Sequence, residues 1–291
     1  MRWVDAIIQG TLLGGLYAQY AIGMSLMFGV MRIVNIAHGD LVVLLALIGI
    51  SLAALWGLGP GFLMLLLVPI GALVGWALQR FILNRLVGDD PLPSLIATFG
   101  VSIALQNAML AIWSADTRSL DAGALASKSF QIGEMYIGLL PILVLVTAVI
   151  LTAGLSMVLK GTKFGRALRA AAADRDAATL SGIDTKSVYA KATAVAVGIL
   201  GIAAVFQATR TTIAPADGGG QLIYAFEAVI IGGMGSIWGA FLGAMVLGIA
   251  QVIGSRIDPG WGVLAGHLVF LVVLAWRPQG IMSRNKGGIA T

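Results

Sequence analysis

Cysteine is absent from this chain of 291 residues, and charged residues are scarce, at 11% of the sequence. Without Cys the chain has no disulfide, no thiolate and no Cys-ligated metal site. The two histidines, His38 and His267, stand outside any His-Glu-x-x-His sequence and make a weak case for a metal site. We therefore expect neither a metal nor a cofactor in this chain.

The scarcity of charge also argues against a soluble domain, which carries roughly 25% charged residues. Hydrophobic residues make up 59% of the chain, and apolar runs of about 20 residues recur along its whole length. Lipid offers no hydrogen-bond partner to the backbone, so these runs must be helical. The sequence therefore predicts an all-α polytopic membrane protein with one transmembrane domain over residues 1–291.

The apolar runs predict about eight transmembrane helices and one shorter segment. The expected helices cover residues 5–31, 40–57, 61–87, 92–113, 136–159, 186–209, 221–234, 237–255 and 261–277. The run 221–234 is too short to cross a bilayer at about 1.5 Å per residue, so we expect a half-helix or a re-entrant segment. The first run lacks a basic n-region and an Ala-x-Ala cleavage site, which favours a retained span over a signal peptide.

The Lys and Arg residues predict the orientation, because cytoplasmic loops carry an excess of both. With the N-terminus outside, 13 of the 18 basic residues fall inside and 5 fall outside. The inner set is Arg32, Arg80, Arg85, Lys160, Lys163, Arg166, Arg169, Arg175, Lys186, Lys191, Arg277, Arg284 and Lys286. The outer set is Arg2, Arg118, Lys128, Arg210 and Arg256. We expect a cytoplasmic C-terminus, a cytoplasmic loop at 160–185 and a periplasmic loop at 114–135, either a connector or a contact for a soluble partner.

The first polar interruption, Asn35-Ile36-Ala37-His38-Gly39-Asp40, separates the first two expected helices. Irregular backbone at membrane depth persists only where it is packed in protein or lines a wet cavity. Asp40 would lie in the first turn of the next helix, where a negative charge suits the helix dipole. Two interpretations stay open: a broken helix lining a transport pathway through Asn35, His38, Gly39 and Asp40, and an ordinary cytoplasmic turn beside Arg32.

A second interruption, Pro215-Ala216-Asp217-Gly218-Gly219-Gly220, precedes the short run that contains Glu227. It becomes the counterpart of the first break if helices one to four and six to nine are inverted repeats. Paired broken segments in two halves of a chain point to a transport site. Glu227 would then line the pathway, or it would face the polar boundary of the membrane.

Small residues form stripes near the second break, with Gly235, Gly239 and Gly243 standing four apart. Stripes of this kind let helix backbones approach closely in a membrane. We assign a helix-packing role to Gly232, Gly233, Gly235, Ser236, Gly239 and Gly243.

No complete motif for catalysis is found in the chain. Gly100-Val101-Ser102-Ile103 resembles a fragment of an intramembrane serine protease motif, with His267 as a possible base, but the second Gly of that motif is missing. Lys160-Gly161-Thr162-Lys163 lacks the Gly-x-x-x-x-Gly-Lys-Ser/Thr order of a phosphate loop. We predict no enzyme activity, and an ATPase, if one drives the protein, is another chain. We expect His267 to be a buried hydrogen-bonding residue, and Gln106, Asn107 and Gln251 to make helix–helix contacts.

Residues 160–191 form the one long polar segment, with seven basic and three acidic side chains. From Gly165 to Ser181 the composition favours a helix, and Gly182 is a natural stop. Alanines at 170–173, 177 and 178 keep one surface slim enough to enter a groove on another protein. The alternative is a helix lying on anionic lipid, for which its mostly Ala apolar face offers few large anchors.

Three landmarks resemble the inner-membrane permease subunits of branched-chain amino acid ABC transporters, over nearly the whole chain. The 35–40 segment is similar to the family's Asn-[Phe/Met/Ile]-Ala-His-Gly-[Glu/Asp] sequence. The run Gly232-Gly233-Met234-Gly235-Ser236-Ile237-Trp238-Gly239 is similar to its Gly-Gly-x-Gly-Ser-x-x-Gly signature. Its coupling loop, a relative of the Glu-Ala-Ala motif, is similar to Gly165-Arg166-Ala167-Leu168-Arg169-Ala170 with Asp174, Ala178, Leu180, Gly182 and Ile183.

This resemblance implies a permease subunit of an ATP-binding-cassette importer in the bacterial inner membrane. The implied partners are a second permease chain (a copy or a paralogue), two ATPase subunits that carry ATP and Mg, a periplasmic solute-binding protein and membrane lipid, with no nucleic acid. The 160–185 loop would then couple to the ATPase through Gly165, Arg166, Arg169, Ala170, Ala171, Asp174, Ala178 and Gly182.

Glu227 stands where many amino acid permeases of this family carry an uncharged residue, so the solute stays open between branched-chain amino acids and related small solutes. A urea, amide or aromatic-acid permease of the same family is one alternative. An ion-coupled secondary transporter or channel is the alternative from a different class, and as a carrier it would need ion-coupling carboxylates in the pathway and no ATPase partner.

Overall fold

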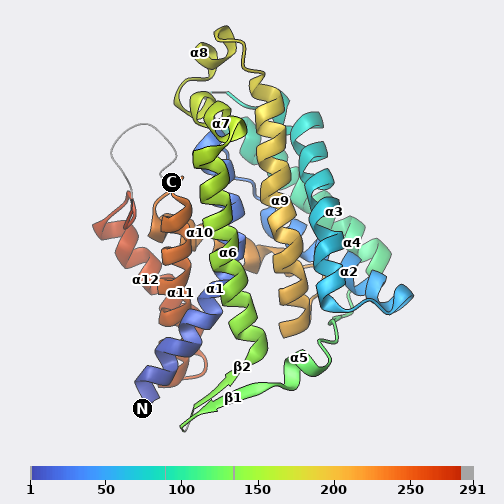
Figure 1. Cartoon of the computed structure of the whole chain (residues 1–291), viewed down its shortest axis with the longest axis vertical. Helices are drawn as coiled ribbons and strands as arrows, with labels where there is room; N and C mark the ends of the chain where they lie inside the picture. Colours follow the sequence, from blue (N-terminus) through green and yellow to red (C-terminus); the bar gives the residue numbers. More distant parts are fainter. Residues whose placement is uncertain (1, 89, 134, 283–291) are drawn as a thin grey trace.

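A computed structural model describes residues 2–88, 90–133 and 135–282, which form one bundle of helices (Figure 1). Within these residues, seven helices are long and apolar enough to cross a membrane. They are α1 (Arg2–Met31), α2 (His38–Trp56), α3 (Pro60–Phe81), α4 (Leu92–Trp113), α6 (Leu139–Gly161), α9 (Thr185–Arg210) and α11 (Ile237–Ile257). The predicted all-α polytopic fold is confirmed. Arg284 and Lys286, two of the basic residues assigned to the inside, lie outside the described residues.

Two further apolar helices are shorter, α10 (Gly218–Gly232) with 15 residues and α12 (Trp261–Trp276) with 16. The expectation of a short helix after the second break is confirmed. The run 261–277 was expected to be a full span, but 16 residues at about 1.5 Å each fall short of a hydrocarbon core of about 30 Å. The helix ends at Trp276 because the residue before Pro278 is disfavoured in helical conformation.

At two places a short element of another kind replaces part of an expected helix. The helix expected over 61–87 ends at Phe81 and is followed by the short 3₁₀ helix η1 (Leu83–Arg85). The helix expected from residue 136 begins at 139, because β2 (Met135–Gly138) pairs in antiparallel fashion with β1 (Ser129–Ile132). Gly133, with φ of +63°, supplies the turn between these strands. The loop expected at 114–135 thus extends to residue 138 and contains a hairpin and the short helix α5 (Ala124–Ser127).

Helix α1 runs through the centre of the bundle and is covered by α6, α9, α10 and α11 (Figure 1). Glycines permit these close approaches, as expected for helices packed in lipid. A Cβ on Gly248 of α11 would overlap the backbone of Gly10 in α1. Likewise a Cβ on Gly71 of α3 would lie 2.6 Å from the carbonyl oxygen of Val197 in α9. The pairs α1–α11 and α3–α9 are therefore held by backbone-to-backbone packing.

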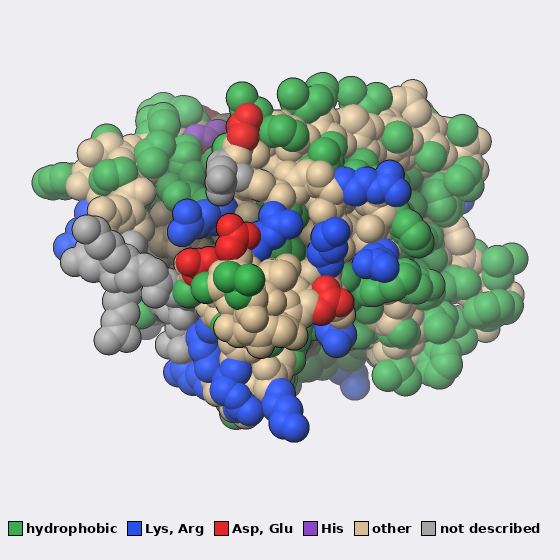
Figure 2. Space-filling model, turned by 90° about the horizontal axis from the view of Figure 1, so that it is seen from above, with side chains coloured by type: hydrophobic (Ala, Val, Ile, Leu, Met, Phe, Trp, Pro, Cys, Tyr) green, Lys and Arg blue, Asp and Glu red, His purple; other side chains and the backbone are tan. Residues whose placement is uncertain are grey.

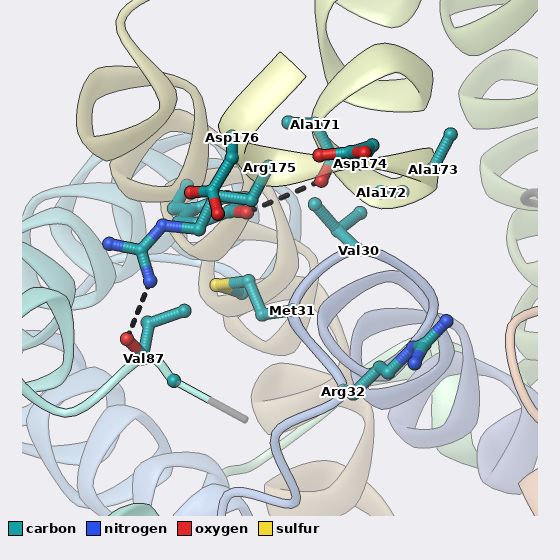
Figure 3. A pocket seen from close by; sticks show the side chains of 12 residues that line it. Val30, Met31, Arg32, Val87, Ala171, Ala172, Ala173, Asp174, Arg175 and Asp176 are labelled. Atoms are coloured by element: carbon teal, nitrogen blue, oxygen red, sulfur yellow. Dashed lines mark hydrogen bonds between the residues drawn. The ribbon is translucent and has the colours of Figure 1, made fainter. Parts of the chain in front are cut away.

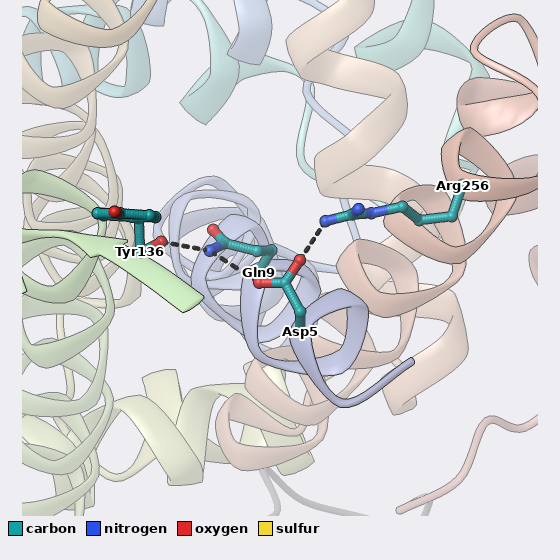
Figure 4. A network of polar contacts seen from close by, with 4 residues as sticks. All are labelled: Asp5, Gln9, Tyr136 and Arg256. Carbon is teal, nitrogen blue, oxygen red and sulfur yellow. Dashed lines mark hydrogen bonds and ion pairs between the residues drawn. The ribbon is translucent and has the colours of Figure 1, made fainter. Parts of the chain in front are cut away.

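A polar network ties the chain together at the end of the bundle that carries the N-terminus (Figure 4). The Arg256 guanidinium at the end of α11 forms an ion pair with the Asp5 carboxylate in the first turn of α1. Gln9 donates a hydrogen bond of 3.1 Å to the carbonyl oxygen of Tyr136 in β2. The start of α1, the end of α11 and the hairpin are thereby joined.

Candidate functional site

The two polar interruptions of the sequence meet inside the bundle, where α2 and α10 begin against each other. A Cβ on Gly39 would overlap the carbonyl oxygen of Gly218, and a Cβ on Gly218 would overlap the carboxylate of Asp40. Only a residue without a side chain allows two backbones to approach this closely. The first turns of α2 and α10 are therefore in direct backbone contact.

Asp40 lies in the first turn of α2, as expected, and is only 2% exposed. Its two carboxylate oxygens accept hydrogen bonds from α4, one from the Ser102 hydroxyl at 2.5 Å and one from the Gln106 amide at 2.9 Å. Ser102 therefore donates its hydrogen bond to Asp40, and no hydrogen bond joins it to a histidine among the described residues, which leaves the protease fragment without its base. Neither α4 residue belongs to the predicted pathway set. The signal that points to them is a pair of polar side chains four residues apart on one face of an apolar helix.

The segment before α2 is buried, with Asn35, Ala37 and His38 at most 1% exposed. The Asn35 side-chain oxygen accepts a hydrogen bond of 3.1 Å from the Ala37 backbone, which makes a local turn. His38 Nε2 lies 2.9 Å from the carbonyl oxygen of Tyr20, well inside α1. Burial of this kind is incompatible with an ordinary exposed turn, although Arg32 just before it is exposed.

Glu227 is 3% exposed on α10, and its carboxyl group is hydrogen-bonded to His267 Nδ1 of α12. The His267 side chain is 37% exposed, so the expectation that it is buried is wrong, although it is hydrogen-bonded. The second carboxylate oxygen of Glu227 has no partner among the described residues. Glu227 is therefore a buried acid with one free oxygen, held between the two short helices.

The glycine-rich run of the second half forms the tight turn between α10 and α11. Ser236 accepts a hydrogen bond of 3.0 Å from the Gly239 backbone and so caps α11. Gly233 and Gly235 have φ of +108° and +84°, a region that favours glycine. Added Cβ atoms would meet neighbouring backbone throughout this run: Gly232 faces Gly239, Gly243 faces Ala228, and Gly235 faces Gly29 of α1.

The polar loop forms two helices, α7 (Lys163–Ala173) and α8 (Arg175–Leu180), at the opposite end of the bundle from the N-terminus (Figure 1). The expectation of a helix over 165–181 misses the break at Asp174. The Asp174 side chain caps α8 by accepting a hydrogen bond of 2.9 Å from the Ala177 backbone, which favours an extended residue there.

Gly182 ends α8, as expected, with φ of +83°. Its N–H donates to Thr179, and the next N–H, of Ile183, donates to the Ala178 carbonyl oxygen, both at 3.0 Å. This pair of bonds is the Schellman arrangement of a helix C-terminus.

The coupling residues expected from the sequence fall into two groups on this α7–α8 unit. The first group faces the chain itself: Gly165 packs on the backbone of Leu159, Arg169 donates to the carbonyl oxygen of Leu159, and Ala171 and Ala178 are buried. Ala170 is half-buried, whereas Arg166, Asp174 and Gly182 are exposed. Leu180 at the tip is 90% exposed. Figure 2 shows Lys and Arg side chains gathered over this end of the molecule.

A cavity of about 270 Å³ lies where the α7–α8 junction meets the end of α1 (Figure 3). The Arg175 guanidinium crosses it and donates a hydrogen bond of 2.6 Å to the carbonyl oxygen of Val87. Val30, Met31 and Arg32 line the other side. The α7–α8 unit is thus attached to the membrane helices by specific contacts and does not hang from a free loop.

Comparison with known proteins gives a consistent result over nearly the whole chain. The family described as "branched-chain amino acid transport system / permease component" matches residues 6–274. The high-affinity branched-chain amino acid transport permease BraD of Pseudomonas aeruginosa is 32% identical, over 98% of this chain and 97% of the relative. The permease LivH of Escherichia coli is 26% identical over the same shares. The fructose import permease FrcC of Rhizobium meliloti is 28% identical, over 94% of this chain and 82% of the relative. No solved structure matches the chain.

Proposed function

This chain belongs to the family of branched-chain amino acid transport permease components, and we propose that it is the membrane subunit of an importer driven by ATP hydrolysis on separate chains. The observation that carries the proposal is the α7–α8 unit, a basic pair of helices that projects from one end of an apolar bundle (Figure 1). Leu180 at its tip is 90% exposed and is therefore accessible to a partner.

The ATPase contact is made by the outer surface of this unit. Arg166, Asp174 and Leu180 are exposed there and are free to meet a partner. Gly165, Arg169 and Ala171 bind the chain's own α6 and α9 side and keep the unit in a fixed position. A rigid connection of this kind transmits a displacement of the ATPase to the membrane helices, which a flexible loop would absorb.

The solute path runs along the contact of this chain with a second permease subunit, beside the starts of α2 and α10. Broken helices that begin inside a bundle present free backbone N–H groups and a positive dipole end to a solute. The polar groups of this region come from the break residues Asn35, His38, Gly39 and Asp40 and from the pair of buried Glu227 with part-exposed His267. Ser102 and Gln106 of α4 are hydrogen-bonded to Asp40, so a movement of α4 would displace Asp40 and the start of α2.

The α7–α8 end faces the cytoplasm of a bacterium and the hairpin end faces the periplasm, in the inner membrane. The excess of Lys and Arg at the α7–α8 end supports this orientation (Figure 2). ATP and Mg bind to the two ATPase subunits, and a periplasmic solute-binding protein delivers the solute to the hairpin end.

Reconstitution in lipid vesicles tests the proposal. The chain is co-expressed with its ATPase and second permease chains, and uptake of radiolabelled leucine, isoleucine and valine is measured with the solute-binding protein outside. Uptake is expected only when ATP is present on the side of the membrane to which the ATPase is bound. Uptake by the chain alone, driven by a proton or sodium gradient, would instead make it a secondary transporter.

The same vesicles distinguish the solutes. Urea, short amides, aromatic acids and fructose are offered in parallel, the last because of the similarity to a fructose import permease. If one of these is taken up in an ATP-dependent manner and the branched-chain amino acids are not, the proposal of an ATP-driven importer stands and the proposed substrate is wrong.

A further inference from the structure

A second cavity, of about 220 Å³, opens between α1, α9 and α10. Gly39, Asp40 and Gly218, where α2 and α10 meet, are not among its lining residues. Its size is below the roughly 300–1,000 Å³ of pockets for drug-sized ligands, so it suits a small solute. Its polar lining residues are Tyr17, Tyr20, Gln207, Arg210, Thr211, Gln221 and Tyr224.

The walls of this cavity are fixed by hydrogen bonds and ring stacking. Tyr20 donates to the side-chain oxygen of Gln207 at 2.7 Å, and Tyr17 donates to Gln251 at 2.6 Å. The rings of Tyr17 and Tyr224 stack with centroids 4.7 Å apart. A pocket whose side chains are already held loses little entropy when a solute binds.

Two groups of the cavity remain without a partner. Gln221 is 8% exposed, and its side-chain oxygen has no hydrogen-bond partner among the described residues. A buried amide oxygen without a donor is costly and needs an N–H or O–H from a ligand or a water.

The second such group is the Arg210 guanidinium at the rim of the cavity. It forms neither an ion pair nor a side-chain hydrogen bond among the described residues. A guanidinium offers its N–H groups as a planar fork that matches the two oxygens of a carboxylate. The cavity thus combines a carboxylate receptor at its rim with a buried acceptor for an N–H group.

We propose that this cavity is a binding station for the head group of a neutral α-amino acid, with the carboxylate on Arg210 and the ammonium on Gln221. This inference rests on the proposed importer function and names its substrate class. Leu13, Leu16 and the ring faces of Tyr17 and Tyr224 provide the apolar surface for the solute's side chain. A solute without a carboxylate, such as urea or fructose, leaves Arg210 unused.

The test uses the permease–ATPase complex in nanodiscs, without the solute-binding protein, and measures binding by saturation-transfer NMR. The probes are L-leucine, L-leucinamide, which lacks the carboxylate, and 4-methylpentanoate, which lacks the ammonium. The variants are Arg210→Gln and Gln221→Leu. Lys128→Gln is the matched control, because it removes an exposed positive charge just before the hairpin, at the same end of the bundle.

Arg210→Gln is expected to weaken leucine binding about tenfold or more, the loss typical of a hydrogen bond to a charged group, and to leave leucinamide binding unchanged. Gln221→Leu is expected to weaken leucine and leucinamide and to leave 4-methylpentanoate unchanged. If a variant loses affinity only for the probes that carry the group it contacts, the loss comes from that contact and not from a general change in structure. Lys128→Gln should bind all three probes like the unaltered chain.

Equal binding of leucine by the unaltered chain and both cavity variants overturns the inference, and water alone then satisfies Gln221. If vesicles still show ATP-dependent leucine uptake in that case, the importer function stands without this site. Conversely, probe binding that depends on Arg210, in a chain that shows no ATP-dependent uptake, keeps the site and refutes the importer. Basal ATPase activity and a single size-exclusion peak verify that each variant complex is assembled. Arg210→Lys keeps the positive charge without the planar fork and is expected to lose less affinity for leucine than Arg210→Gln.

Discussion

Gly218 and Gly219 are neighbours at the start of α10, yet their surroundings are opposite. A Cβ on Gly218 would overlap the Asp40 carboxylate, whereas a Cβ on Gly219 would meet nothing within 4 Å. At the residue scale this difference separates glycines that the fold requires from glycines that it merely contains.

Gly218→Ala is therefore expected to destabilise the protein by about 1–3 kcal/mol, because the added methyl forces α2 and α10 apart. Thermal unfolding in detergent measures the effect. Gly219→Ala serves as the control and should leave the unfolding temperature unchanged or slightly higher. Equal behaviour of the two variants would contradict the close contact of the two breaks.

The pair of Glu227 and His267 gives a second prediction at this scale. Removal of one partner leaves a buried charge without compensation, which costs about 3–5 kcal/mol for a fully buried pair. His267 is 37% exposed, so His267→Leu should cost less than that range. The double variant Glu227→Leu with His267→Leu should be more stable than His267→Leu alone, since no charge is then left unpaired. A double variant less stable than both single variants would refute this account of the pair.

The α7–α8 unit shows how an element is defined by its caps more than by its composition. Asp174 starts α8 and Gly182 ends it, while alanines fill both helices. One aspartate turns a stretch of favourable helix formers into two helices, because its side chain satisfies backbone N–H groups that a continuous helix would bond internally.

Gly182→Ala is expected to cost about 1–2 kcal/mol locally, because the residue has φ of +83°. The end of α8 should loosen, and the amount of solute transported per ATP hydrolysed should fall. Gly161→Ala is the matched control, since that glycine lies in a helix and has nothing within 4 Å of its added Cβ. Unchanged coupling in the Gly182 variant would argue against an ATPase contact at α8.

At the scale of the whole molecule, the α7–α8 unit and the hairpin mark opposite ends of the bundle (Figure 1). Because the chain has no Cys, single introduced cysteines report their location without background. Lys128→Cys and Arg166→Cys both replace exposed residues, one at each end.

In spheroplasts, a membrane-impermeant maleimide is expected to label Lys128→Cys and to spare Arg166→Cys until the membrane is opened. The physical reason is that Lys and Arg gather at the α7–α8 end of the bundle, and cytoplasmic loops carry an excess of both. Labelling of Arg166→Cys in intact spheroplasts would reverse the orientation and remove the ATPase from its proposed contact.

The apolar runs alone were enough to predict the long helices, because a backbone in lipid must satisfy its hydrogen bonds within each segment. The positions of both breaks were also visible, since polar residues and glycines interrupt the runs. The hairpin at 129–138 was not predicted, and neither was the short length of α12, because strand pairing and helix ends depend on local turns that apolar content does not report.

The sequence by itself determined that this chain is a polytopic helical membrane protein with one long polar segment between its helices, because hydropathy and charge act on each segment independently. The permease family was indicated only by the resemblance of its motifs. Only the tertiary structure decided which polar residues meet: Asp40 with Ser102 and Gln106, Glu227 with His267, and Arg210 with Gln221 around one cavity. These partners come from different helices, and their proximity depends on how the helices pack.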